Sequence, residues 1–239
     1  QFLPGGNSRT VLQYAPYPAF IVRGEGCRVY DADGNERIDF ANNHSALILG
    51  HANPAVIKAV SEQLPLGASF AGPTESQIKL ARMICQRVPG VEHVRFANSG
   101  TEAAMNAVRA AMAFTGKEII GKFEGAYHGT ADSLSISVGP PVDQAGAPDR
   151  PAGYLQTQLT RGGAGVPRWV LDQVVVLPFN DFPATKRIIE EHSSELAAVI
   201  IDPVMAGSGY PDVRDDFLRR LRDLTSELGI VMVMDEVVS

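Results

Sequence analysis

The stretch DDFLRRLRDLTSELGIVMVMDEVV, residues Asp215–Val238, predicts one amphipathic helix followed by one buried strand. Apolar side chains recur at helical spacing on one face of Asp215–Leu228, and Gly229 is typical of a residue that ends a helix. Ile230–Met234 is then a continuous apolar run of strand length. A strand that is apolar on both faces indicates a parallel sheet covered by helices on both sides.

The same alternation continues toward the N-terminus. Leu196–Ile201 is a second wholly apolar strand. Further strands are predicted at Val94–Ala97, Glu118–Lys122 and Val174–Leu177, and helices at Ala55–Leu64, Thr74–Val88, Gly100–Phe114 and Ala184–His192. Because apolar strands alternate with amphipathic helices, the sequence predicts an α/β fold with a mostly parallel sheet.

The N-terminal part of the chain has a different pattern. Short β-type runs predict strands at Phe20–Arg23, Arg28–Asp31 and Arg37–Phe40, with a hairpin turn at Asp33-Gly34-Asn35. We therefore expect a β-containing N-terminal segment, residues 1–50, followed by a larger α/β domain, residues 51–239.

The alternation stops between Gly139 and Asp172, where the sequence is rich in glycine and proline. A loop of this length in a compact domain is usually functional or mobile. We interpret residues 139–172 as a surface excursion near the site, which could serve as a lid. The alternative is a disordered insertion without a role.

Composition argues against several classes of partner. Hydrophobic residues make up 45% of the chain and charged residues 20%, as in ordinary globular proteins. The net charge of −6 argues against nucleic acid or an anionic membrane as a partner, and no apolar run has the length of a membrane span. Cys27 and Cys85 are isolated thiols, which we expect to be reduced in a cytoplasmic protein.

A candidate anion site lies in NSGTE, residues Asn98–Glu102, where a predicted strand gives way to a helix. Free N–H groups and the positive end of the helix dipole attract anions there. Gly100 allows a close backbone approach, and Thr101 adds a hydroxyl group. The alternative is a capping box, with Ser99 as the N-cap and Glu102 three residues later.

Two other motifs follow predicted strands. Tyr127-His128 comes after Glu118–Lys122, and ligands of open α/β sheets bind at the carboxyl ends of the strands. An aromatic ring there can stack on a flat ligand; the alternative is an ordinary loop.

Asp235 ends a very apolar strand, where a carboxylate needs a partner, and Asp202 has the same position after Leu196–Ile201.

The partner of such a carboxylate is either a protonated pyridine nitrogen or a Mg²⁺ ion. The chain contains neither a G-x-x-x-x-G-K-[ST] loop nor a G-x-G-x-x-G motif. An anion cradle, an aromatic platform and a carboxylate together look like a site for pyridoxal 5′-phosphate (PLP).

These motifs resemble those of the class III aminotransferases of PLP fold type I, in the branch of glutamate-1-semialdehyde aminomutase and the β-amino-acid aminotransferases. The similarity runs almost end to end, in ordered blocks. They are PGGNSR (Pro4–Arg9), GCRVYDADGNERIDF (Gly26–Phe40), LILGHANPAV (Leu47–Val56), NSGTEA (Asn98–Ala103), KFEGAYHG (Lys122–Gly129) and MDEV (Met234–Val237). The resemblance implies that residues 1–50 belong to the small domain and 51–239 to an incomplete large cofactor-binding domain.

The resemblance also implies roles for single residues. Ser99, Gly100 and Thr101 would hold the cofactor phosphate, and Tyr127 would stack on the pyridine ring with His128 beside it. Asp235 would pair with the ring nitrogen, Val237 would pack on the opposite ring face, and Asp202 would contact the cofactor or a nearby loop. Arg9 matches a clamp for the substrate carboxylate; its alternative is a surface arginine in an N-terminal arm.

Three departures from the family pattern follow. Asp202-Pro203 stands where the family usually has Glu-Pro, and Met205–Gly209 lacks the asparagine of typical aminomutases. None of the five lysines matches the Schiff-base position, which we expect beyond Ser239 together with the rest of the fold. The lysines are Lys58, Lys79, Lys117, Lys122 and Lys186.

The expected function is therefore that of an aminotransferase, which moves an amino group between an amino acid or amine and a keto or aldehyde acceptor. An aminomutase, a racemase or a decarboxylase is compatible with the same scaffold. A non-catalytic cofactor-binding subunit is a further alternative, supported by the missing lysine. The resemblance implies a homodimer.

Overall fold

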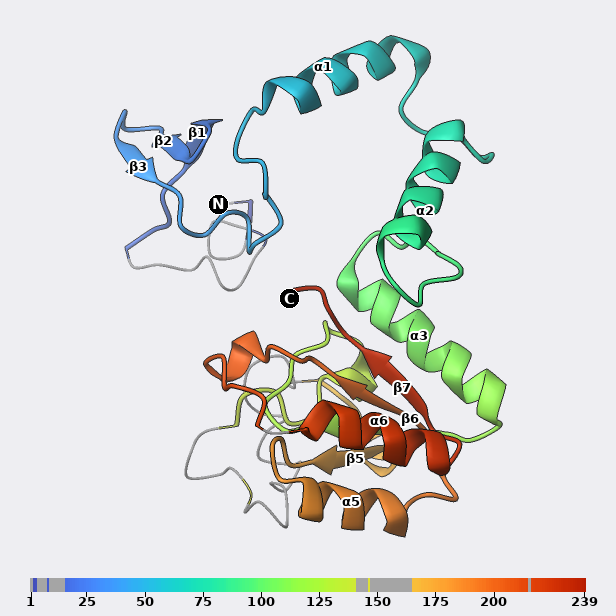
Figure 1. Ribbon diagram of the computed structural model, residues 1–239. Helices are drawn as coiled ribbons and strands as arrows, with labels where there is room; N and C mark the ends of the chain where they lie inside the picture. Colours follow the sequence, from blue (N-terminus) through green and yellow to red (C-terminus); the bar gives the residue numbers. More distant parts are fainter. Residues whose placement is uncertain (1, 4–7, 9–15, 141–145, 147–164, 215) are drawn as a thin grey trace. The chain divides into compact units, whose positions relative to one another are not determined.

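The computed structural model describes residues 2–3, 8, 16–140, 146, 165–214 and 216–239 (Figure 1). Contacts divide the chain into two compact units, Gln1–His93 and Val94–Ser239. The domain boundary after residue 50 therefore stays a prediction.

The N-terminal unit contains a small antiparallel sheet. Its strands are β1 (Ile21–Glu25), β2 (Arg28–Asp31) and β3 (Glu36–Ile38), paired in that order. The predicted hairpin turn is confirmed: Gly34 has φ +85° and donates its N–H to the carbonyl of Asp31. The third strand ends at Ile38, two residues before its predicted end.

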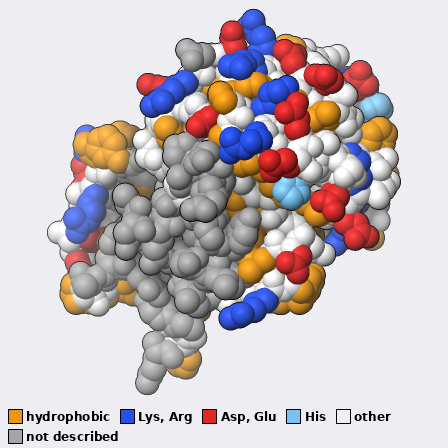
Figure 2. All heavy atoms as spheres, turned by 90° about the horizontal axis from the view of Figure 1, so that it is seen from below, with side chains coloured by type: hydrophobic (Ala, Val, Ile, Leu, Met, Phe, Trp, Pro, Cys, Tyr) orange, Lys and Arg blue, Asp and Glu red, His pale blue; other side chains and the backbone are white. Residues whose placement is uncertain are grey.

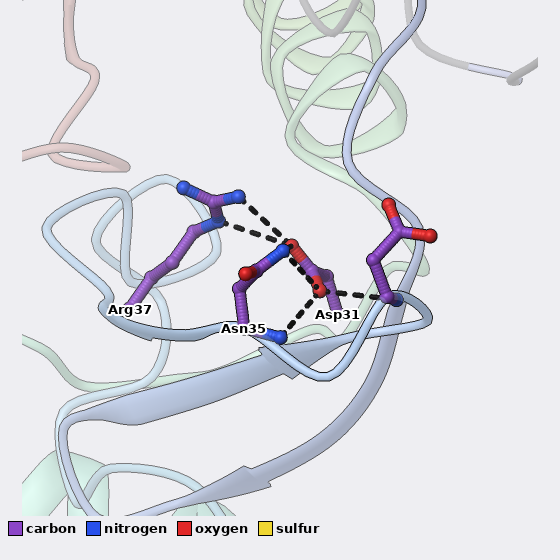
Figure 3. A network of polar contacts seen from close by, with 4 residues as sticks. Asp31, Asn35 and Arg37 are labelled. Atoms are coloured by element: carbon purple, nitrogen blue, oxygen red, sulfur yellow. Dashed lines mark hydrogen bonds and ion pairs between the residues drawn. The ribbon is translucent and has the colours of Figure 1, made fainter.

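One buried carboxylate fixes this hairpin (Figure 3). The side chain of Asp31 is 4% exposed and accepts hydrogen bonds from the backbone N–H groups of Asp33 and Asn35 at 3.1 and 2.8 Å. It also accepts from the Asn35 amide and, at 2.9 Å, from the Arg37 guanidinium. The hydrogen bonds from Asn35, with a further contribution from Arg37, lower the pKa of Asp31 to about 2.

Replacing Asp31 with asparagine should therefore lower the melting temperature of the full-length protein at neutral pH. Since the folded-state pKa is depressed, the contribution is complete above the ordinary value of 3.8 and is lost as the pH falls toward about 2. The difference from wild type should shrink over that interval. Asp33→Asn is the control, because only the backbone N–H of Asp33 joins the network. A difference that is constant between about pH 5 and about pH 2 would contradict the assignment.

Two α-helices follow in this unit, with a short 3-10 helix, Leu64–Leu66, after the first. They are α1 (Pro54–Gln63), capped by the Asn53 side chain, and α2 (Glu75–Arg87), capped by Thr74. Neither helix has a buried residue, and the apolar side chains of Val56, Ile57 and Val60 are about half exposed.

The second unit is built on a four-stranded parallel sheet. Its strands are β4 (Ile119–Phe123), β5 (Val174–Leu177), β6 (Leu196–Ile201) and β7 (Val231–Met234), in the order β5-β4-β6-β7. The predicted parallel α/β fold is thus confirmed.

Helices cover both faces of this sheet (Figure 1). Helices α5 (Phe182–Glu191) and α6 (Phe217–Glu227) pack on one face, where Phe123 and Phe217 meet edge to face at 5.7 Å. Helix α3 (Gly100–Thr115) packs on the other face through Ala104, Val108 and Ala111. Every residue of β6 is buried, as expected for a central parallel strand.

The predicted strand Val94–Ala97 is wrong. These residues form no strand, because no described segment pairs with them. A strand requires a hydrogen-bonded neighbour as well as apolar side chains.

The edge strand β7 borders a groove of about 630 Å³, lined by Phe114, Arg222 and Met232 among others. Its lining residues lie along the outer edge of the sheet, and they include none of the predicted site residues. An uncovered edge of this kind is suited to pairing with a further strand.

The surface charge is mixed. On the face drawn in Figure 2, basic and acidic side chains lie interspersed over the residues that the structure describes. On α5, for example, Lys186 and Glu190 form an ion pair at 2.9 Å. No helix in the described part of the chain combines the length and the apolar character that a membrane span requires.

Candidate active site

The predicted site residues of the second unit gather at one edge of its sheet. Tyr127 and His128 follow β4, Asp202 follows β6, and Asp235 follows β7. Because the strands are parallel, their carboxyl ends meet at this edge. The N-terminus of α3 is joined to it through Thr101, whose hydroxyl accepts a hydrogen bond from the Thr130 N–H at 3.1 Å.

The start of α3 is a well-capped helix end. The Ser99 hydroxyl accepts from the Glu102 N–H at 3.2 Å, as in a capping box. The Glu102 carboxylate reaches back to the Asn98 N–H at 2.7 Å, one residue before the N-cap. The predicted capping box is therefore present, and it is compatible with an anion site at the same helix start. The N–H groups of Gly100 and Thr101, the first two residues of the helix, remain as donors for an anion.

Two glycines bring the backbone close at this point. A Cβ atom on Gly129 would lie 2.6 Å from Thr101 Cα, and one on Gly100 would lie 3.3 Å from a methyl group of Val237. Gly129 also has φ +89°, a backbone conformation that residues with a side chain rarely adopt. These contacts hold the loop after β4 and the segment after β7 against the first turn of α3.

His128 and Asp235 form a partly buried pair between two strand ends. The Nδ1 atom of His128 lies 2.8 Å from Oδ2 of Asp235, and the imidazole side chain is fully buried. His128 Nε2 has no hydrogen-bond partner among the residues that the structure describes. The pair fixes the orientation of the Asp235 carboxylate toward the sheet edge.

The Asp235 carboxylate is held in its ionised form. Burial alone would raise its pKa, but the hydrogen bond from His128 and the N–H of Val237 at 3.1 Å outweigh burial. The pKa of Asp235 therefore lies below its ordinary value. Its own N–H donates to the carbonyl of Ile201 at 2.8 Å, which joins the ends of β6 and β7.

Asp202 is buried at the end of the neighbouring strand. Its carboxylate accepts from the Val204 N–H at 2.9 Å, across Pro203. This contact gives Asp202 a role in shaping the turn after β6. Within the described ranges, no three His, Cys, Asp or Glu side chains gather as a metal site would need.

Two apolar side chains flank this edge and remain exposed. Tyr127 is 53% exposed and Val237 is 67% exposed. Exposed apolar groups beside a buried carboxylate can accept the two faces of a flat aromatic ligand.

The sequence did not indicate how the turn before Tyr127 is held. Lys122 is completely buried, and its ammonium group donates to the carbonyls of Phe123 and Ala126 at 3.1 and 3.0 Å. Burial lowers the pKa of Lys122 to about 7, against the opposing effect of nearby Glu124. The sequence signal for this role of Lys122 was a lysine within an otherwise apolar strand.

The model of the class III aminotransferase family matches residues 11–239. The chain belongs to this family. A glutamate-1-semialdehyde 2,1-aminomutase of Aquifex aeolicus is 42% identical over 100% of the chain and 54% of that relative. An omega-transaminase structure from Sphaerobacter thermophilus has a TM-score of 0.89 and 48% identity, over 100% of the chain and 53% of the transaminase. The structure of a β-phenylalanine aminotransferase from Variovorax paradoxus has a TM-score of 0.79 and 36% identity, over 98% of this chain and 48% of that aminotransferase.

The chain spans about half the length of the relatives it matches. The predicted fold type I and the predicted cofactor are confirmed: the family is PLP-dependent, and a solved transaminase with PLP bound is 38% identical to this chain. The roles of individual residues and the type of reaction remain proposals.

The described residues of this class III chain fit the chemical groups of PLP. Donors at the start of α3 suit a phosphate, and the ionised Asp235 suits a pyridinium N–H. Exposed Tyr127 and Val237 suit the two ring faces. Arg9, the predicted substrate clamp, and most of the excursion 139–172 lie outside the described residues.

Proposed function

We propose that the complete protein is a PLP-dependent aminotransferase that moves an amino group between an amino acid or amine and a keto or aldehyde acceptor. The observation that carries the proposal is the contact between buried His128 and partly buried Asp235 at the carboxyl edge of the sheet. A low-pKa carboxylate held there by a histidine is suited to keep a pyridine nitrogen protonated.

PLP, when bound, supplies an electron sink next to the amino group of the substrate. In our proposal, Asp235 keeps the proton on the ring nitrogen and His128 holds Asp235 in place. Tyr127 and Val237 orient the ring from its two faces. Gly100 and Thr101, with Ser99 as the cap, bind the phosphate, while Asp202 shapes the adjacent turn.

Replacing Thr101 with alanine should weaken PLP retention more than it weakens folding. The change removes one hydroxyl group from the proposed phosphate site, a loss of roughly 1–3 kcal/mol for a hydrogen bond to a charged group. Thr101→Ser is the matched control, because it keeps the hydroxyl that accepts from Thr130. Equilibrium dialysis gives the affinity, and thermal melts with and without PLP give the stability. Equal destabilisation with and without PLP would favour a purely structural role for Thr101.

The covalent anchor is proposed to lie in a part of the protein other than residues 1–239. Lys122 is a poor candidate because its side chain is buried and donates to two carbonyls. Lys117 donates to the carbonyl of Ser193, and Lys186 is paired with Glu190. Borohydride treatment of the PLP-loaded full-length protein, followed by peptide mass spectrometry, should label a lysine that is absent from this chain. Stoichiometric labelling of Lys122 would contradict the proposal.

An aminomutase is the second candidate, and the relatives named glutamate-1-semialdehyde 2,1-aminomutase favour it. Against it, Met205–Gly209 contains no asparagine. Two assays distinguish the reactions. An aminotransferase consumes an amino donor only when a keto or aldehyde acceptor is present and releases two products. An aminomutase converts glutamate-1-semialdehyde into an isomer without any acceptor.

We also propose that Arg9 clamps a substrate carboxylate and that the protein is a homodimer. The half-exposed apolar side chains of α1 support the dimer, since such residues are usually covered in the assembled protein. Sedimentation of the full-length protein should give a dimer. A monomer with full activity at assay concentration would contradict it.

A further inference from the structure

A short turn connects β4 to the proposed ring platform. It comprises Phe123–Ala126 and is closed by a hydrogen bond from the Ala126 N–H to the Phe123 carbonyl at 3.2 Å. The Gly125 N–H donates to the carbonyl of Ser137 at 2.8 Å. Tyr127 and His128 follow the turn directly, so its conformation decides where both side chains point.

Side-chain donors from two different segments bind the carbonyls of this turn. Lys122 lies beneath it and donates to the carbonyls of Phe123 and Ala126. Ser208, from the loop after β6, donates its hydroxyl to the Gly125 carbonyl at 3.0 Å. Three of the four carbonyls of the turn therefore have a side-chain donor.

The contact with Ser208 is a close one. Gly125 has φ +80°, and a Cβ atom on it would lie 2.3 Å from the Ser208 hydroxyl oxygen. Met205, three residues before Ser208, is buried and has φ +36°. A residue with a side chain adopts this conformation only when its surroundings impose it. The loop after β6 is thus shaped to bring Ser208 onto the turn.

We propose that Lys122 and Ser208 are positioning residues that fix the Phe123–Ala126 turn and so set the orientation of Tyr127 toward the cofactor ring. The inference rests on the proposed function for the role of Tyr127. A lysine serves here because one nitrogen on a long apolar stem reaches two buried carbonyls, which an apolar side chain would leave unsatisfied. The loop after β6, whose sequence departs from the family pattern at Asp202 and Met205–Gly209, thereby influences the orientation of the cofactor ring through Tyr127.

The test uses the full-length protein and two pairs of variants. Ser208→Ala removes the donor to Gly125, and Ser226→Ala is its control, because the Ser226 hydroxyl also donates to a carbonyl, on α6. Lys122→Met removes the buried donor, and Lys117→Met is its control, because Lys117 donates to the Ser193 carbonyl. If Lys122→Met fails to fold, Ser208→Ala decides the question alone.

Three measurements are made on each variant. Amide hydrogen exchange of residues 124–127 in the cofactor-free protein reports the turn itself. Equilibrium dialysis gives the Kd for PLP, and the visible circular dichroism of bound PLP reports the orientation of its ring. For Ser208→Ala we expect faster exchange, a Kd raised roughly threefold to tenfold, as for one lost hydrogen bond, and an altered dichroism. Ser226→Ala should match wild type in all three.

The outcomes separate this inference from the proposed function. Faster exchange with an unchanged Kd and unchanged dichroism would overturn the inference and leave Ser208 a structural residue. Amide exchange of residues 124–127 that is unchanged in Ser208→Ala would overturn the inference as well. A wild-type protein that retains no PLP would instead overturn the proposed function, while the exchange data would still report whether the two side chains hold the turn.

Discussion

Replacing Asp235 with asparagine in the full-length protein is expected to reduce turnover by about 10²–10³-fold, the usual effect of removing one preorganised electrostatic group. The protein should stay folded, because the amide oxygen can still accept from the Val237 N–H while the amide NH₂ group donates to Nδ1 of His128 in its other tautomer. The neutral amide cannot stabilise a protonated ring nitrogen, so the electron sink weakens. Steady-state kinetics with a saturating amino donor measure the effect.

A control for this variant lies at the same edge of the sheet. Asp181 follows β5 and caps α5 by accepting from the Ala184 N–H at 3.0 Å. Asparagine is an equally good N-cap, so Asp181→Asn should retain its activity. Near-normal turnover of Asp235→Asn would remove Asp235 from the proposed site.

Gly129→Ala is expected to have the second large effect. The positive φ costs about 1–2 kcal/mol for a residue with a Cβ. The clash with Thr101 Cα adds typically 1–3 kcal/mol of overpacking. The backbone of Thr101 cannot turn aside as a flexible side chain can, so the loop after β4 and the start of α3 must separate. We expect PLP affinity to fall by roughly 30-fold or more, at about tenfold for each 1.4 kcal/mol.

The control for Gly129 isolates the clash from the backbone strain. Gly139 also has a positive φ, +61°, but a Cβ atom there would meet no atom of the described residues within 4 Å. Gly139→Ala should therefore cost some stability and leave PLP affinity unchanged. If both variants lose affinity equally, the contact between Gly129 and Thr101 is not what holds the phosphate site together.

The fold was largely predictable because its strands and helices have strong local patterns. Leu196–Ile201 is a strand whose residues are all apolar, and it is β6 as predicted. The end of α3 was equally clear: the helix was predicted to end at Phe114 and ends at Thr115, directly before Gly116, which takes the left-handed conformation that favours glycine. Val94–Ala97 failed as a strand because pairing with a neighbour is a property of the fold and not of those four residues.

The sequence indicated which residues lie at the strand ends of the candidate site, but not the contacts between them. The chain order placed His128 and Asp235 at strand ends, but they are 107 residues apart, and only the strand order β4-β6-β7 explains how they meet. Likewise, nothing in the sequence connected Ser208 with Gly125, because two loops of different strands bring them together. The buried Lys122 was visible as an unusual residue in an apolar strand, without an indication of what it binds.

The protonation state of the PLP ring nitrogen tests the central claim most directly. The full-length protein is loaded with PLP that carries ¹⁵N in the ring, and its nitrogen resonance is followed by NMR from neutral to mildly acidic pH. Because the pKa of Asp235 is lowered, the carboxylate stays ionised over this range and the nitrogen should remain protonated. In Asp235→Asn the bound ring should lose that proton near neutral pH. A wild-type ring nitrogen without a proton at neutral pH, or a protonated one in Asp235→Asn, would contradict the account.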